Sequence, residues 1–114
     1  MKVEEFAKLI DGTIKSISGG QNEVISGFTC DLLSWVMAKG KPGCAWITVQ
    51  THMNVIAVAS LHEMACVVCP EGIKMEEASI ARAEEEGIAI VESDLSAYEI
   101  CGRLYAKGIP AVGD

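Results

Sequence analysis

The chain is short of aromatic side chains, of basic side chains and of uninterrupted hydrophobic runs. Aromatic residues make up 5% of its 114 residues, and 9 Lys and Arg oppose 16 Asp and Glu, for a net charge of -7. An acidic surface repels phosphate backbones, so nucleic acid is not an expected partner. The longest apolar stretch, 55–70, is interrupted by Ser60, His62 and Glu63 and is shorter than the roughly 20 residues of a membrane helix. No membrane partner is expected either.

The sequence also lacks an even set of cysteines and an export signal. There are 5 cysteines, and no amino-terminal stretch joins a basic region to an apolar core and a small-residue cleavage site. We therefore expect a cytoplasmic protein with reduced thiols. Half of the residues are hydrophobic, which is enough apolar material for one compact domain over residues 1–114.

Three short runs, at 44–49, 65–69 and 88–91, are continuously apolar rather than alternating. Such runs are typical of parallel strands that are buried on both faces. Each run precedes a helical pattern, at 53–63, 75–86 and 95–107, so the order predicts crossover units. The predicted fold class is α/β, with three layers and a mostly parallel sheet flanked by helices.

The first third of the chain predicts additional elements. The amphipathic pattern at 3–10 predicts a helix that Gly12 closes as its C-cap, and residues 31–39 predict a short helix. Segments 13–17 and 24–30 are rich in β-branched residues and predict two extra strands. Two arrangements stay open for these strands, because they can join the main sheet or form a separate hairpin.

Polar residues follow the predicted parallel strands, and ligands bind at the carboxyl ends of such strands because helix N-termini gather there. A helix N-terminus favours an anion, so a small anionic ligand is expected. Thr51, Ser93 and Asp94 are also explained as simple helix caps, whereas His52 is less easily explained by capping. The predicted ligand-binding residues are Gln50, Thr51, His52, Asn54, Asp31 and Ser93.

Catalytic motifs are missing from the sequence. It contains no phosphate-binding P-loop, no dinucleotide-binding glycine motif and no nucleophile elbow. Cys30, Asp31 and His52 could converge as a thiol, a base and an orienting group, which keeps a small hydrolase or transferase as a third hypothesis. The leading prediction is a protein without catalytic residues and without a cofactor.

Cys66 and Cys69 form a Cys-x-x-Cys pair, and His62 precedes it. This spacing supports an alternative hypothesis of a cysteine-ligated metal or iron-sulfur accessory protein. Within a strand, however, residues three apart point to opposite faces. The favoured interpretation is therefore that both thiols are buried, reduced and inert small hydrophobic groups.

Several motifs together resemble the DRTGG domain family over nearly the whole chain. They are Asp31-Leu32-Leu33-Ser34-Trp35 within 24–38, Gln50-Thr51-His52, Leu95-Ser96 and Gly102-Arg103-Leu104-Tyr105. The sequence departs from the family at its signature, where Gln21 and Asn22 replace the Asp and Arg, Ile25 and Ser26 replace the Thr and first Gly, and only Gly27 is kept. A neutral Asn22 lacks the charge-assisted bonds that an Arg would give an anion at that turn.

The resemblance implies an α/β domain similar to the amino-terminal domain of HPr kinase/phosphorylase, which also occurs beside CBS domains in regulated pyrophosphatases. In those settings it is a regulatory or dimerising module, and the kinase chemistry belongs to a separate P-loop domain. We therefore predict a non-catalytic regulatory or sensor module that binds a small anionic metabolite, a nucleotide or a protein partner. We also expect a homodimer, which an apolar surface of Trp35, Val36 and Met37 would form.

Overall fold

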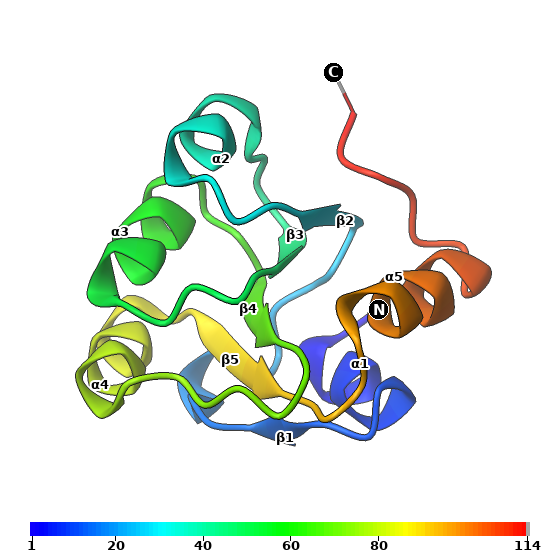
Figure 1. The fold of residues 1–114 in the computed structure, drawn as a ribbon, viewed down its shortest axis with the longest axis horizontal. Helices are drawn as coiled ribbons and strands as arrows, with labels where there is room; N and C mark the ends of the chain where they lie inside the picture. Colours follow the sequence, from blue (N-terminus) through cyan, green and yellow to red (C-terminus); the bar gives the residue numbers. More distant parts are fainter. Residues whose placement is uncertain (114) are drawn as a thin grey trace.

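The computed structural model describes residues 1–113, which form one five-stranded sheet (Figure 1). The strand order is β1-β5-β4-β3-β2; β2 to β5 are parallel, and β1 pairs antiparallel with β5. The strands are β1 (Thr13–Ile14), β2 (Ser26–Thr29), β3 (Cys44–Ile47), β4 (Cys66–Cys69) and β5 (Ala89–Glu92). The prediction of a mostly parallel α/β sheet is confirmed.

Helices cover both faces of the sheet, as predicted for three layers (Figure 1). On one face lie α1 (Val3–Leu9) and α5 (Ala97–Ala106), and on the other lie α2 (Leu33–Lys39), α3 (Met53–Leu61) and α4 (Glu77–Glu86). A short 3-10 turn, η1 (Ile17–Gly19), separates β1 from β2. Within residues 1–113, no helix combines the length and apolar character that crossing a membrane requires.

The core explains why the central strands are almost entirely apolar. Every residue of β3, β4 and β5 is buried, and all of them except Glu92 have side chains in one of two apolar clusters, because side chains alternate along each strand. The Glu92 carboxylate instead accepts from the Met75 N–H at 3.0 Å. Ala45 and Ile47 face α1 and α5, whereas Trp46 faces α2 and α3. The Trp46 indole N–H is satisfied because it donates to the backbone oxygen of Cys30 at 2.8 Å.

The two extra strands lie on opposite edges of the sheet and do not form a hairpin. The predicted strand at 13–17 is shortened to β1 beside β5, and the one at 24–30 becomes β2 beside β3. Between them the chain crosses the amino ends of the strands, where Asn22 Nδ2 donates to the backbone oxygens of Ala65 at 3.1 Å and Gly87 at 2.8 Å. These bonds hold the connection across the sheet.

The expected cap of the first helix was wrong. The helix ends at Leu9 with Ile10 as its C-cap, and Asp11 takes the left-handed conformation with a φ of 53°. Asp tolerates that conformation because its short polar side chain bonds locally. Gly12 is needed for another reason: a Cβ there would lie 2.7 Å from Cγ1 of Val91, so only glycine allows the chain to pass this close to β5.

Candidate functional site

The predicted ligand residues lie in loops at the carboxyl ends of the strands, except Asn54, which lies in the first turn of α3. The loop between β3 and α3 is tied to its neighbours on both sides. On one side, Asp31 Oδ1 accepts from the Thr48 hydroxyl at 2.8 Å and from the Val49 N–H at 2.9 Å. Gln50 Nε2 donates to the Asp31 backbone oxygen at 3.0 Å. The structure therefore brings Asp31 and Gln50 together and holds the two loops in one arrangement.

On its other side, this loop is tied to α4. The Ser79 hydroxyl donates to the Thr51 backbone oxygen at 2.8 Å, and the Thr51 hydroxyl lies 3.4 Å from Glu76 Oε2. Ser79 is fully buried, so its bond is shielded from water. Glu76 places a carboxylate beside Thr51, which favours hydrogen-bond donors on a ligand at that point and opposes a bare anion.

The N-cap of α3 is His52, and the expectation that Thr51 would fill this position was wrong. His52 Nδ1 accepts from the Asn54 N–H at 3.2 Å, so capping does explain this histidine. Because Nδ1 accepts, the ring proton of the neutral side chain sits on Nε2. His52 and Asn54 are both exposed, so their remaining donors and acceptors face solvent.

Ser93 is buried, whereas Gln50, His52 and Asn54 are exposed. Its hydroxyl donates to the Ile10 backbone oxygen at 2.7 Å and accepts from the Leu95 N–H at 3.2 Å. This hydroxyl joins the end of α1 to the end of β5. The cap of α5 is instead Ser96, whose hydroxyl accepts from the Glu99 N–H at 3.1 Å.

The three residues of the enzyme hypothesis have separate partners. The Cys30 thiol lies 3.8 Å from the Leu32 backbone oxygen, the Asp31 carboxylate is bonded to Thr48 and Val49, and the His52 ring caps α3. Over residues 1–113, no hydrogen bond joins Cys30, Asp31 and His52 to one another. In the described loops, the Cys30 thiol is therefore not hydrogen-bonded to either of its proposed partners.

The cysteine pair is buried, as predicted, and its members face opposite sides of the sheet. Cys66 belongs to the cluster under α1 and α5, and Cys69 to the cluster under α2, α3 and α4. Burial raises the pKa of the Cys66 thiol and raises the pKa of Cys69 to about 12. His62 lies at the C-cap of α3 with Nε2 2.8 Å from the Met37 backbone oxygen. The described chain gathers no three His, Cys, Asp or Glu side chains in a metal-binding group.

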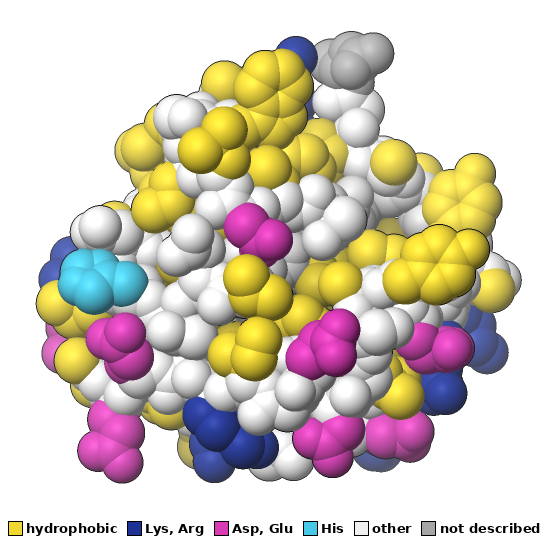
Figure 2. Space-filling view, in the orientation of Figure 1, with side chains coloured by type: hydrophobic (Ala, Val, Ile, Leu, Met, Phe, Trp, Pro, Cys, Tyr) yellow, Lys and Arg dark blue, Asp and Glu magenta, His cyan; other side chains and the backbone are white. Residues whose placement is uncertain are grey.

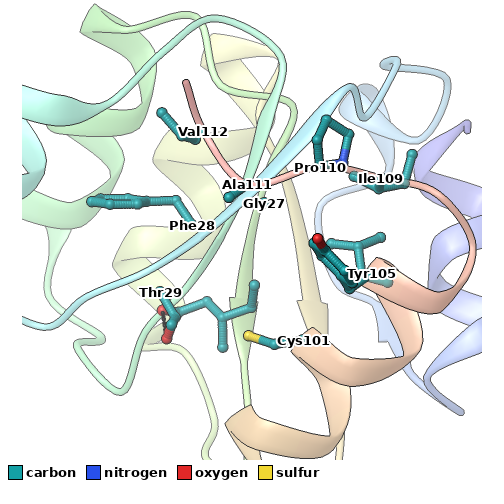
Figure 3. Close-up of a pocket in the computed structure, with 11 residues that line it drawn as sticks. Gly27, Phe28, Thr29, Cys101, Tyr105, Ile109, Pro110, Ala111 and Val112 are labelled. Carbon is teal, nitrogen blue, oxygen red and sulfur yellow. Dashed lines mark hydrogen bonds between the residues drawn. The ribbon is translucent and has the colours of Figure 1, made fainter. Parts of the chain in front are cut away.

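Sequence reasoning missed a hollow beside β2. Its volume is about 390 Å³, and it lies between β2, α5 and the segment after α5 (Figure 3). The signal in the sequence that could have pointed to this hollow is Gly27, the one residue that matches the signature of the resembled family. Its lining residues are Gly27, Phe28, Thr29, Ile47, Cys101, Leu104, Tyr105, Ile109, Pro110, Ala111 and Val112.

Comparison with known proteins supports the fold. No family model and no curated protein matches the sequence. The structure is similar to the crystal structure of the CBS and DRTGG domains of the regulatory region of Clostridium perfringens pyrophosphatase, complexed with the activator diadenosine tetraphosphate. The TM-score is 0.73 at 10% identity, over 96% of this chain and 47% of that one. The fold is DRTGG-like. The chain spans about half the length of this neighbour, and at this identity the likeness concerns the fold alone.

Proposed function

We propose that this chain is a cytoplasmic regulatory module that binds a small ligand and catalyses no reaction of its own. The observation that carries the proposal is the likeness of 96% of the chain to a regulatory region that was crystallised with a nucleotide activator. The candidate loops support it, because their side chains offer hydrogen bonds from a fixed framework rather than a paired nucleophile and base.

The proposed ligand is a small anionic metabolite of the nucleotide class, bound at the start of α3. The helix N-terminus favours phosphate, because it carries roughly half a positive charge and unpaired N–H groups. Gln50, His52 and Asn54 are exposed around it and can donate to phosphate or base oxygens. The Glu76 carboxylate would accept from a ribose hydroxyl or a base amino group. This combination favours a nucleotide over inorganic phosphate.

Thermal shift measurements test this proposal. The parent chain, Gln50→Ala and His52→Ala are each heated with ATP, AMP, diadenosine tetraphosphate and inorganic phosphate. A nucleotide at one hundred times its Kd should stabilise the parent by about 2.7 kcal/mol, and both variants should lose most of that gain. His62→Ala is the matched control, because this second histidine lies at the opposite end of α3. Stabilisation that survives both loop substitutions, or no stabilisation of the parent by any nucleotide, would reject the site.

The module is further proposed to act as a homodimer that associates through α2. The expected surface of Trp35, Val36 and Met37 needs one correction, because Val36 is fully buried against the core. Leu32, Trp35 and Met37 are 63%, 52% and 44% exposed, and Figure 2 shows hydrophobic side chains gathered over α2. An exposed apolar patch is typical of a contact site, and a twofold contact is the commonest closed arrangement.

A further inference from the structure

Within residues 1–113, the β2 edge of the sheet pairs with another segment at one residue only. The segment 109–113, called the strap below, crosses β2 in parallel at Gly27. The Gly27 N–H donates to the Pro110 oxygen at 2.9 Å, and the Val112 N–H donates to the Gly27 oxygen at 3.0 Å. Both backbone groups of Gly27 therefore point away from β3.

The next outward-facing pair on this edge belongs to Thr29. Backbone groups alternate in direction along a strand, so the N–H and C=O of a residue two positions after Gly27 point the same way. Thr29 is exposed, and the strap pairs with β2 at Gly27 alone within residues 1–113. An unpaired strand edge is a template for another extended segment.

A hollow lies on each face of this edge. On the α5 side is the hollow of about 390 Å³, whose walls include Cys101 and Tyr105 (Figure 3). On the α2 side a hollow of about 260 Å³ is lined by Phe28, Trp35, Lys39, Val112 and Gly113. Phe28 and Val112 border both hollows, so the two are separated only by β2 and the strap.

Gly27 and Leu104 of α5 both line the hollow on the α5 side. A Cβ at Gly27 would lie 3.0 Å from Cδ2 of Leu104, so glycine lets α5 approach the strand closely. Further along α5, Tyr105 is 72% exposed and forms a wall that no other described segment covers. The strap fills little of the hollow, because Ala111, which lines only the α5 side, is small.

We propose that the β2 edge is an acceptor site for an extended apolar peptide segment of a protein partner, and that the strap occupies this site until the partner displaces it. An added strand would bond to Gly27 and Thr29 and place alternate side chains in the two hollows, which is how strand addition achieves both affinity and specificity. The strap itself shows the chemistry that fits, since Pro110, Ala111 and Val112 are apolar and extended along the edge.

The charge of the residues that line the hollows further restricts which peptides would fit. Of the described residues that line these two hollows, Lys39 alone is charged, and its ammonium lies 5.5 Å from the centre of the Trp35 ring. An acidic residue on the α2 side of the added strand would pair with this ammonium. The proposed peptide site contains none of the loop residues proposed for the small ligand. The peptide proposal and the small-ligand proposal can therefore be tested independently.

The test measures binding of a fluorescein-labelled peptide to full-length variants of the chain. The peptide has the sequence of residues 108–113, with leucine in place of Ala111 so that a larger side chain fills the α5-side hollow. Val112→Pro removes the strap N–H that bonds to Gly27, and Ala111→Pro is the matched control because the Ala111 N–H makes no bond to β2. The peptide should bind Val112→Pro roughly three- to tenfold more tightly than the parent or the control, the factor expected for one net hydrogen bond. Equal affinity for all three chains would overturn the proposal.

Two further measurements locate the binding. In the Val112→Pro background, Tyr105→Ala should weaken the peptide, whereas Tyr98→Ala, on the same helix but outside the lining, should not. The Gly27 amide should exchange hydrogen faster in Val112→Pro and slow again with peptide; exchange that never changes contradicts the proposal. If Val112→Pro without peptide instead forms larger assemblies than the parent does at the same concentration, the occupant is a second copy of the chain and the proposed partner class is wrong.

Discussion

Asp31 illustrates how one side chain can hold two loops together. Its Oδ1 is shared between the Thr48 hydroxyl and the Val49 N–H, and its backbone oxygen accepts from Gln50. Bonds to a charged acceptor are stronger than neutral ones and leave their donors unsatisfied when the acceptor is removed. Asp31 therefore acts as a positioning residue for the loop that carries Gln50.

Replacing Asp31 with alanine should destabilise the chain and loosen this loop. We expect Asp31→Ala to lower the free energy of unfolding by about 1–3 kcal/mol, because a buried hydroxyl and an N–H lose a charged acceptor. Urea unfolding measures this change. The matched variant Asp94→Ala, at an exposed residue beyond β5, should stay within about 0.5 kcal/mol of the parent. Equal losses in both variants would show that the Asp31 bonds add nothing.

Cys69 is a second residue whose environment determines its chemistry. Burial is the main cause that raises its pKa to about 12, and the nearby Glu92 carboxylate adds to the effect. Below about pH 8.5, the ordinary thiol value, folded and unfolded chains both keep the proton. Between that value and 12 only the unfolded chain releases it, so rising pH favours unfolding.

This linkage predicts an alkaline loss of stability. From about pH 9 upward, Cys69 should lower the free energy of unfolding by up to about 1.4 kcal/mol per pH unit. Urea unfolding from pH 7 to 10.5 should give a shallower slope for Cys69→Ala than for the parent. Val68→Ala, at a buried neighbour without a titratable group, should lower stability while the slope stays that of the parent. Parallel slopes for parent and Cys69→Ala would contradict the argument.

At the scale of elements, the Asn22 amide joins the connection between β1 and β2 to the segments that lead into two other strands. Asn22 Nδ2 bonds to the oxygens of Ala65 and Gly87, which precede β4 and β5. Asn22 stands where the resembled family has an Arg, and here the side chain joins two strand connections. The side chain at this position therefore has a structural use in this chain.

The two departures from the signature should therefore differ in their effect on stability. Asn22→Ala removes both bonds and should cost about 1–2 kcal/mol. Gln21→Ala, at the exposed neighbouring position, should change stability by less than about 0.5 kcal/mol. Thermal and urea unfolding of the pair measure the difference. If Gln21→Ala proves as destabilising as Asn22→Ala, the role of the Asn22 amide is wrong.

At the scale of the whole molecule, helices cover both faces of the sheet, and exposed apolar side chains lie on several elements, with α2 and α5 among them. Figure 2 shows these side chains over α2 and over α5, with a strip of other atoms between them. Tyr98 and Tyr105 on α5 are 90% and 72% exposed, and Trp35 on α2 is 52% exposed. The strand at the opposite edge is β1, which has two residues and is too short to pair with a long added strand. Association is therefore expected at the β2 side.

The proposed homodimer gives a prediction at this scale. Sedimentation of the parent at micromolar concentration should show a species of twice 12.1 kDa. Trp35→Ala should weaken association by roughly thirtyfold or more, as for a central aromatic contact worth at least about 2 kcal/mol. Ile17→Ala, which is 75% exposed on η1, should leave the dimer intact. A 12.1 kDa parent at every concentration would reject the dimer.

Much of the fold could be predicted from the sequence, because burial on both faces demands continuous hydrophobicity in β3, β4 and β5. Loop positions could be predicted in the same way, since residues that follow parallel strands share one edge. The bonding roles in those loops could not be predicted. Capping by His52 rather than Thr51, and the burial of Ser93 against Ile10, depend on where the chain passes after the strands end.

The sequence by itself determined the fold class, the three layers and the burial of the Cys66 and Cys69 thiols, since these follow from continuously apolar runs that are each followed by a helical pattern. The tertiary structure alone decided that β1 and β2 lie on opposite edges, because strand pairing joins residues far apart in the chain. It also decided the hollows beside β2, which form where Gly27, α5 and residues 109–113 meet. Such a space depends on the distance between elements, which no local pattern of residues encodes.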